Sequence, residues 1–492
     1  MGVASDWRDE RIRELEAELA AKDELITEQQ ATIAQQETRI AALEKQVAEL
    51  LEKLGRNSRN SHLPPSTDPP GARKGKDGGK RKKRRGKRKR GGQPGHGGAH
   101  RALLAAHQVD KVVNLYPVEC ENCWKALPEV PDPSARRYQQ IEVPPIRPHT
   151  TEWRCHTVGC PLCGYKTRSR YDEKKIPSSP FGPRLMAMMA LLTGVYHLSR
   201  RKTVTLLSDI VGVRVSLGAL SAVEARVSEA VEPAVDEAWQ KVGAGEVKHT
   251  DGTTWLQAGS TLSLWTLATT AATVFKILAD GSKKTLEPLY GALRGILVSD
   301  RAKALNFWAM DRRQICWAHL LRKFVSFSER DGPAGAIGRE LLDYTGILFE
   351  YWHDYKSGKL ERERFVAWMS ALRHRVEATL ERAVASDIER FAGSCADILG
   401  HKDALWTFVD RDGVEPTNNH AEREIRAFVL WRKRSFGTQS QRGNVFAERI
   451  MTVAHTARKQ NKNVFGFLAA CCRARVDRAR PPSLFEAEPV IA

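Results

Sequence analysis

Residues 246–256 read EVKHTDGTTWL, and this stretch decides how the rest of the chain is interpreted. Its β-branched and polar residues around Asp251 predict a strand that carries one acidic side chain. An apolar run, GILVSD, predicts another strand that ends on Asp300. Far along the chain, PTNNHAEREIR opens a predicted helix that carries Glu422. Two aspartates on strands and a glutamate on a distant helix are the parts of a two-metal site for phosphoryl transfer.

The order of the predicted elements around these residues indicates a mixed sheet. The strands are predicted at 246–257, 262–269, 273–278, 295–300 and 312–318, and the helices between them at 284–293 and 302–310. A three-strand meander followed by right-handed crossovers places the first and fourth strands side by side. This is a ribonuclease-H-like arrangement, and it would place Asp251 beside Asp300.

Each acidic residue also has a purely structural explanation. Asp251 and the glycine after it could form a turn, and Asp300 could cap the helix that follows. Glu422 lies three residues after Asn419, which is the spacing of a capping box, and four residues before Arg426, which is the spacing of a helical ion pair. Taken together, on these elements and in this order, the three acidic residues favour the metal site.

The charge of the chain favours a polyanionic partner. The 492 residues carry a net charge of +19, and a chain of this length is expected to form several domains. Residues 73–90 hold thirteen Lys/Arg and one acid, so they contribute +12. Pro, Gly and Ser around this run predict a disordered linker over 55–101. Its basic side chains can bind DNA phosphates regardless of base sequence; they are Lys80, Arg81, Lys82, Lys83, Arg84, Arg85, Lys87, Arg88, Lys89 and Arg90. A solubility tail or an RNA-binding segment would have the same composition.

A heptad pattern over residues 8–54 predicts a long helix. Its a positions are Ile12, Leu19, Ile26, Ile33, Ile40, Val47 and Leu54, and its d positions are Leu15, Lys22, Gln29, Gln36, Leu43 and Leu50. β-branched residues at a with Leu at d favour a parallel dimer, which the three polar d positions weaken. We therefore expect a homo-oligomer formed through a coiled coil. The alternative is one long helix packed on its own chain.

Five of the nine cysteines lie between residues 120 and 163 and indicate a zinc site. Cys120 and Cys123 form one C-x2-C pair, and Cys160 and Cys163 form another after 36 intervening residues. Such pairs present four thiolates to one tetrahedral Zn²⁺, which would be structural because no ligand position stays open. Cys155, just before the second pair, leaves the fourth ligand ambiguous.

Two further features concern the segments outside the predicted sheet. Residues 176–243 are expected to be helical, and a short turn before a helix that starts near Ser216 gives helix-turn-helix spacing, although an ordinary helical hairpin fits as well. The first ten residues lack the apolar core of a secretory signal, and the most apolar window, 185–198, is shorter than the ~20 residues of a membrane-spanning helix. We expect a soluble, intracellular, reduced protein without a membrane partner.

Eight stretches resemble one family of bacterial transposases. In chain order they are LGRNSRNSHLPPS, GGQPGH, the double C-x2-C, HTDGTTW, LVSDRAKAL, CWAHLLRKF, PTNNHAEREIR and SFGTQSQRG. With these motifs the chain resembles the insertion-sequence-sixty-six family of DDE transposases over almost its whole length. The resemblance implies a cytoplasmic, nucleoid-associated protein that binds double-stranded DNA. Small accessory proteins of its element are further candidate partners, and the sequence does not show whether they are needed.

By position, the resemblance implies roles for individual residues. The catalytic triad falls on Asp251, Asp300 and Glu422, which would hold two Mg²⁺ ions with Asp251 as the bridging ligand. Water would attack first and free a 3′-OH at the element's end, and this hydroxyl would then attack a target phosphodiester. Auxiliary residues match at His319, Asn418, Asn419 and Arg426. His319 could contact the scissile phosphate, order the metal site or form a structural hydrogen bond; Cys316 is expected to be a buried strand residue.

Two other functions stay open at this point. One is a catalytically inactive, dimeric, zinc-containing DNA-binding protein, which the intact acidic triad disfavours. The other is a ribonuclease-H-like nuclease without strand transfer. The predicted segments are a coiled coil (8–54), the basic linker (55–101), a zinc-binding domain (102–175), a helical DNA-binding region (176–243), the first part of the catalytic core (244–324), a helical insertion (325–412), the second part of the core (413–460) and a C-terminal helix and tail (461–492).

Overall fold

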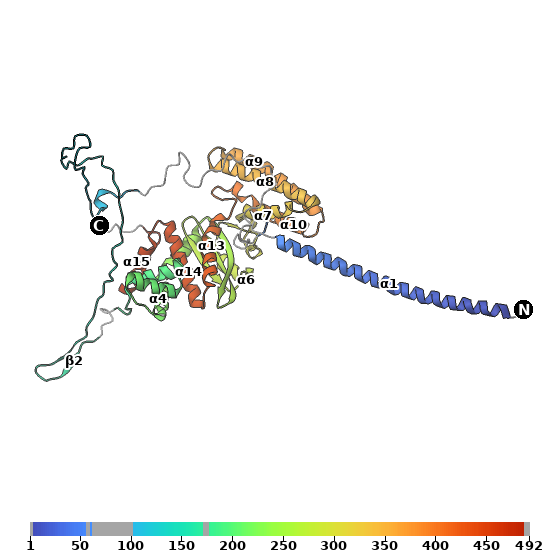
Figure 1. The fold of residues 1–492 in the computed structure, drawn as a ribbon, viewed down its shortest axis with the longest axis horizontal. Helices are drawn as coiled ribbons and strands as arrows, with labels where there is room; N and C mark the ends of the chain where they lie inside the picture. Colours follow the sequence, from blue (N-terminus) through green and yellow to red (C-terminus); the bar gives the residue numbers. More distant parts are fainter. Residues whose placement is uncertain (1–2, 56–59, 62–101, 171–176, 487–492) are drawn as a thin grey trace. The chain divides into compact units, whose positions relative to one another are not determined.

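The structure is a computed structural model that describes residues 3–55, 60–61, 102–170 and 177–486 (Figure 1). The basic run from Lys80 to Arg90 lies outside these residues, as does most of the predicted linker. Contacts divide the described residues into two compact units. One contains those of 1–73, 155–204 and 216–492, and the other contains those of 74–154 and 205–215.

A five-stranded mixed sheet with the order β5-β4-β3-β6-β7 organises the larger unit. Its strands are β3 (Val247–Gln257), β4 (Ser260–Ala268), β5 (Thr273–Leu278), β6 (Ile296–Ser299) and β7 (Arg313–Ile315). The first three strands form an antiparallel meander, and β6 and β7 extend the sheet parallel to β3. The first and fourth strands are therefore neighbours, as the order of the predicted elements requires.

The connections between the strands agree with prediction at one place and differ at another. Helix α6 (Lys283–Tyr290) joins β5 to β6 close to the predicted 284–293. The helix predicted at 302–310 is wrong, because this connection holds only two short 3₁₀ turns. Side chains bind the backbone locally there: Asp300 Oδ1 accepts the N–H of Ala302 at 3.0 Å. Such bonds compete with the regular helical ladder.

Two helices of the C-terminal part pack on the meander. They are α13 (Asn419–Ser435) and α14 (Gln441–Lys459), which contact β3, β4 and β5 (Figure 1). The contact is aromatic, since the Phe428 ring lies 5.3 Å from that of Trp255 and 4.9 Å from that of Phe275, measured between centroids. Large apolar rings dominate the burial energy of such a contact, so α13 is held firmly against the strand that carries Asp251.

The other end of the sheet shares a core with the predicted helical insertion. Helix α7 (Trp317–Ser328) begins before the predicted start of the insertion at 325. The later helices are α8 (Gly332–Lys356), α9 (Arg362–Ala385), α10 (Phe391–Leu399), α11 (Lys402–Leu405) and α12 (Thr407–Asp410). Ile296 of β6 and Ile315 of β7 belong to the same buried cluster as Trp317 and Trp406. The insertion is helical as expected, and its core is continuous with that of the sheet.

Further helices complete the larger unit. They are α2 (Pro183–Ala190), α4 (Leu217–Ala230), α5 (Glu232–Ala244) and α15 (Val464–Asp477); α2, α4 and α15 pack together. Helix α4 begins where the sequence predicts, because the Ser216 side chain accepts the N–H of Ala219 at 3.1 Å as an N-cap. Among the described residues, none of the helices is both long and apolar enough to cross a membrane.

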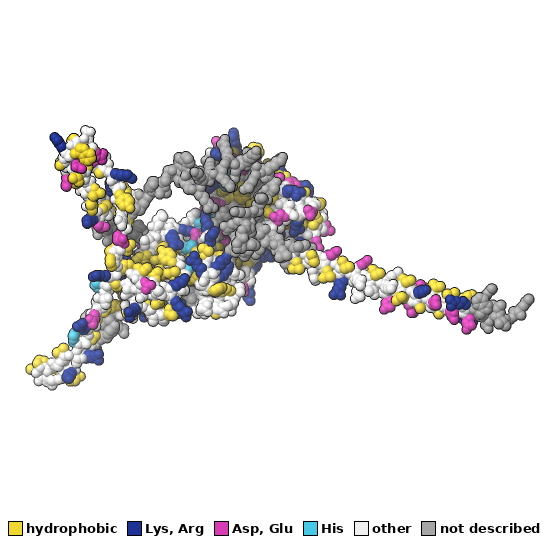
Figure 2. All heavy atoms as spheres, viewed as in Figure 1, with side chains coloured by type: hydrophobic (Ala, Val, Ile, Leu, Met, Phe, Trp, Pro, Cys, Tyr) yellow, Lys and Arg dark blue, Asp and Glu magenta, His cyan; other side chains and the backbone are white. Residues whose placement is uncertain are grey.

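The N-terminal segment forms one helix, α1 (Val3–Gly55), 53 residues long. The side chains at its predicted a positions remain about half exposed, for example Ile12 at 52 %, Ile26 at 50 % and Ile40 at 54 %. Figure 2 shows hydrophobic side chains on the surface at intervals along this helix. The described part of the heptad seam is therefore exposed along α1, and the coiled coil stays a prediction.

Candidate active site and metal-binding residues

Asp251 lies within β3 rather than in a turn. It pairs with Thr266 of β4, and the glycine after it pairs with Trp265, so the strand runs straight through the Asp-Gly pair. A Cβ on Gly252 would lie only 2.9 Å from the Trp265 ring. The glycine therefore leaves room for the Trp265 ring, and the turn explanation of this pair is wrong.

The sheet register brings Asp300 next to Asp251. The last parallel pair between β3 and β6 joins His249 to Val298, and each aspartate lies two residues beyond its strand's member of that pair. Neighbouring strands are about 5 Å apart, so residues at equal offsets remain neighbours. One oxygen of Asp300 accepts the N–H of Ala302. The N-cap of the short turn that follows is Ala302, and no side chain caps this turn, so the capping explanation of Asp300 is wrong.

The start of α13 is tied to the sheet by Asn418. This residue is fully buried, and its Nδ2 donates to Thr250 O, next to Asp251, at 2.7 Å. Its backbone N–H also donates to Cys316 Sγ at 3.1 Å. The capping-box explanation is wrong, because the N-cap of α13 is Asn418 and its side chain forms no capping bond. Glu422, one turn into the helix, thereby lies close enough to Asp251 and Asp300 for their charges to interact.

The three carboxylates interact electrostatically. Burial, together with the negative charges of Asp300 and Glu422, raises the pKa of Asp251 to about 7. Burial also raises the pKa of Glu422; the Arg322 guanidinium lowers it and Asp300 raises it. Three partly buried carboxylates that repel one another form a site that a divalent cation would neutralise, and carboxylate oxygens are the ligands that Mg²⁺ prefers.

Residues of α7 surround Glu422. His319 Nδ1 lies 3.5 Å from Glu422 Oε1, and Arg322 Nη2 lies 3.9 Å from the same oxygen. Cys316 is buried. It occupies the N-cap position of α7, directly after the end of β7, and so does not belong to the strand. The ion-pair partners of Glu422 are thus on α7; Arg426, the partner that helical spacing suggests, is exposed.

A family comparison decides the class of protein to which this site belongs. The model of the transposase IS66 family matches residues 178–445, which is more than half of the chain. The chain belongs to this family of transposases. A second model, of a family of unknown function (DUF6444), matches residues 7–102, and no curated protein matches the chain. The range matched by the transposase model contains Asp251, Asp300 and Glu422.

Two arginines of the transposase site were missed by the sequence analysis. Arg322 follows His319 by three residues in CWAHLLRKF, and this spacing on a predicted helix could have indicated that both side chains share a face. Arg313 is fully buried, and its Nη2 donates to Asp300 O at 3.1 Å and to Ser299 Oγ at 3.2 Å. A buried arginine that holds the backbone after β6 has no signal in a single sequence.

The two cysteine pairs of the transposase form turns of the same kind. In the first, the N–H of Trp124 donates to Cys120 O at 2.9 Å, and the N–H of Cys120 donates to Lys125 O at 2.9 Å. In the second, Gly164 and Tyr165 make the corresponding bonds to Cys160, at 2.9 and 2.8 Å. Trp124 and Gly164 both have a positive φ, 56° and 70°. Because the two turns have the same hydrogen bonds and the same positive φ, we expect both to have the same function.

Backbone N–H groups favour the thiolate form in each turn. Those of Asn122 and Cys123 lower the pKa of Cys120, and those of Cys163 and Leu162 lower the pKa of Cys160. A lowered thiol pKa suits a metal ligand, since Zn²⁺ binds the thiolate. Each turn by itself has the form of half a zinc site, and the four-thiolate site of Cys120, Cys123, Cys160 and Cys163 stays a prediction.

Proposed function

We propose that this transposase cleaves DNA at the ends of its insertion sequence and joins the freed 3′-OH groups to target DNA. Asp251, Asp300 and Glu422 would hold two Mg²⁺ ions. The observation that supports this proposal is the sheet register, which pairs β3 with β6 two residues before Asp251 and Asp300. The charges of Asp300 and Glu422 both act to raise the pKa of Asp251, as expected for three neighbouring carboxylates. The sheet that carries them is proposed to be ribonuclease-H-like, on the basis of its strand order.

The residues around the triad fit this chemistry. Bound Mg²⁺ would activate the attacking oxygen and offset charge on the leaving oxygen. Asp251, which interacts with both other carboxylates, is the proposed bridging ligand. Arg322 and His319 lie beside Glu422 and can donate hydrogen bonds to a phosphodiester. Arg313 donates a hydrogen bond to the backbone oxygen of Asp300 and so helps to fix the position of this residue.

The remaining segments are proposed to bring DNA to the site. The half-exposed seam of α1 fits a parallel coiled coil with a second copy of the chain, which would pair two element ends. The basic run between residues 73 and 90 would supply affinity for DNA phosphates. The helical region around α4 is proposed to contact DNA, and one structural Zn²⁺ is proposed for the two cysteine turns.

The deciding experiment uses the full chain, duplexes carrying the two ends of its element, a target duplex and Mg²⁺. We expect nicked ends and then joined products. Asp251→Asn, Asp300→Asn and Glu422→Gln should each still bind DNA but lower cleavage by at least about 10²–10³-fold, the typical cost of losing one group that stabilises transition-state charge.

Each other outcome identifies an alternative. Binding without nicks in the wild type would favour the inactive DNA-binding protein. Nicks without joined products would favour a nuclease without strand transfer. Robust cleavage by one of the three variants would remove that residue from the triad.

A further inference from the structure

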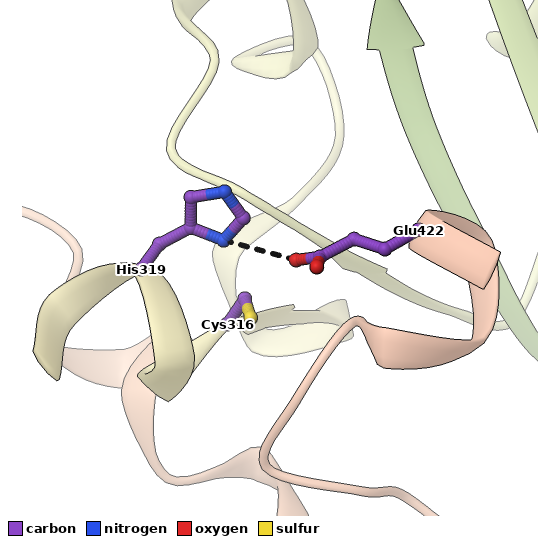
Figure 3. Close-up of side chains that lie close together, drawn as sticks. All are labelled: Cys316, His319 and Glu422. Atoms are coloured by element: carbon purple, nitrogen blue, oxygen red, sulfur yellow. Dashed lines mark ion pairs between the residues drawn. The ribbon is translucent and has the colours of Figure 1, made fainter. Parts of the chain in front are cut away.

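Three side chains at the edge of the site lie close enough together to hold one metal ion. Cys316 Sγ, His319 Nδ1 and a carboxylate oxygen of Glu422 all lie within 4.8 Å of one another. In Figure 3 the His319 and Glu422 side chains face each other, and Cys316 lies beside the gap between them; they come from the start of α7 and the first turn of α13. The 3.5 Å between His319 Nδ1 and Glu422 Oε1 is close to the roughly 3.3–3.8 Å that separates two ligand atoms on a tetrahedral Zn²⁺.

The donor types of this cluster differ from those of the triad. Asp251, Asp300 and Glu422 offer only oxygen, which suits Mg²⁺. Cys316 and His319 offer sulfur and nitrogen, which suit Zn²⁺ and bind Mg²⁺ poorly. Glu422 belongs to both sets. Two different metal ions would therefore compete for one carboxylate.

The surroundings of Cys316 can accommodate a metal-bound thiolate. Burial raises the pKa of this thiol to about 11, so Zn²⁺ would have to displace its proton to solvent. The backbone N–H groups of Asn418, His319 and Ala318 act in the opposite direction and favour the thiolate. The bond from Asn418, 3.1 Å from N to Sγ, holds the sulfur on the side of the cluster. Such outer hydrogen bonds are what orient metal-ligating side chains.

We propose that Cys316, His319 and Glu422 form an inhibitory Zn²⁺ site that overlaps the Mg²⁺ site at Glu422. Zn²⁺ bound by these three residues would take Glu422 away from Asp251 and Asp300, and cleavage would stop until the ion dissociates. Three protein ligands leave a fourth position for water or for a phosphate oxygen of DNA. Zinc binding stands by itself, whereas the inhibition rests on the proposed function.

The first test measures zinc binding to the full chain by equilibrium dialysis, with Zn²⁺ as the probe and metal content as the readout. Wild type should bind one more Zn²⁺ per chain than Cys316→Ser and than His319→Gln. Cys395→Ser is the matched control, because Cys395 is a fully buried cysteine of α10 outside the cluster, and it should bind as much as wild type. Equal zinc content of wild type and both cluster variants would overturn the proposal.

The second test titrates Zn²⁺ into Mg²⁺-dependent cleavage. Cys316→Ser keeps an acceptor for the Asn418 N–H and should cleave at the wild-type rate without zinc. It should need at least about tenfold more Zn²⁺ for half inhibition, since even an outer-shell partner contributes that much to metal affinity. Added Mg²⁺ should relieve inhibition of the wild type. Equal zinc sensitivity of Cys316→Ser and wild type contradicts the inhibitory site.

Two controls separate possible failures. If Cys316→Ser unfolds, as judged by its thermal transition, Cys316→Ala and the zinc content of His319→Gln replace it. If the wild type cleaves no DNA at all, the proposed function fails, but the zinc content of the variants still decides whether the site exists.

Discussion

At the scale of single residues, the paired asparagines 418 and 419 show how neighbours in the chain acquire different roles. Asn418 is fully buried and binds Thr250 O, whereas Asn419 is exposed at the first position of α13. The first of them therefore positions the helix of Glu422 against the strand of Asp251. The second has no comparable burial, so its loss should affect the fold little.

We predict that Asn418→Ala destabilises the protein by about 1–3 kcal/mol, the cost of leaving a buried backbone acceptor without its partner. Cleavage should fall as well, because Glu422 loses its alignment. Asn419→Ala is the matched control and should change stability by no more than about 0.5 kcal/mol, as exposed substitutions do. Denaturant unfolding measures both variants; equal losses would show that the Asn418 side chain does not hold α13.

The raised pKa of Asp251 leads us to predict that magnesium binding depends on pH. Its folded-state pKa of about 7 is above the ordinary 3.8, so without metal the folded protein keeps this proton up to near pH 7. The metal-free fold therefore loses stability as pH rises from about 4 to 7, while the ionised form that binds Mg²⁺ becomes populated only around and above 7. The increase in Tm caused by Mg²⁺ should be larger at pH 8 than at pH 6.

Asp251→Asn serves as the control for this pH effect. It cannot ionise, so its Tm should respond to Mg²⁺ weakly and equally at both pH values. A wild-type response that is the same at pH 6 and pH 8 would contradict either the raised pKa of Asp251 or its role as a ligand.

At the scale of elements, helix α13 determines where the third carboxylate lies. Phe428 packs on Trp255 and Phe275, and Arg432 donates hydrogen bonds to Thr254. On the side of α14, Lys459 Nζ lies 3.1 Å from Glu424 Oε1. The helix is thus fixed along its length as well as at its start, which lets a glutamate far along the chain meet two strand-borne aspartates with little freedom.

The two cysteine turns lead to a prediction at the same scale. Purified protein should hold about one Zn²⁺ per chain after extensive dialysis, and Cys123→Ser or Cys160→Ser should release it and unfold residues near 115–165, because such sites couple metal binding to folding. Metal analysis and limited proteolysis give the readout. A wild type without zinc would contradict the four-thiolate site, and loss of zinc from Cys155→Ser but not from Cys160→Ser would make Cys155 the fourth ligand.

At the scale of the whole molecule, α1 and the basic run are expected to do different work. The basic run carries most of the excess charge and should supply affinity without base readout. The 53-residue helix carries an uncovered apolar seam and should hold two copies of the chain together. Deleting each segment separately distinguishes affinity from pairing.

We predict that deleting residues 73–90 weakens binding to all DNA and flattens the slope of log affinity against log salt, while the preference for element ends persists. Deleting residues 8–54 should leave single-end binding intact and abolish paired-end complexes. Gel shifts with one-end and two-end DNA across a salt series measure both. Paired ends formed by the coil deletion at the wild-type protein concentration would place end pairing in the catalytic body.

Local patterns in the sequence predicted the sheet and its acidic residues. Strand alternation, the Asp-Gly pair and an aspartate at the end of an apolar run are effects of a few neighbouring residues, which is why β3, β6 and Asp300 lie close to their predicted positions. The strand order followed because a meander and two crossovers allow few arrangements. The helix predicted at 302–310 does not form, since local side-chain bonds such as that of Asp300 to Ala302 replace the helical ladder.

Contacts between distant segments were decided only by the tertiary structure. Asn418 reaches Thr250 across 168 positions of the chain, and its N–H reaches Cys316 across 102. Arg313 and Arg322 join the site by the same kind of approach, which no local propensity encodes. The free energy of such contacts comes from burying and pairing polar groups that meet only when the helices have packed on the sheet. The sequence therefore determined the acidic residues, and its motifs named His319, Cys316 and Asn418; packing alone decided how these side chains meet and which arginines join them.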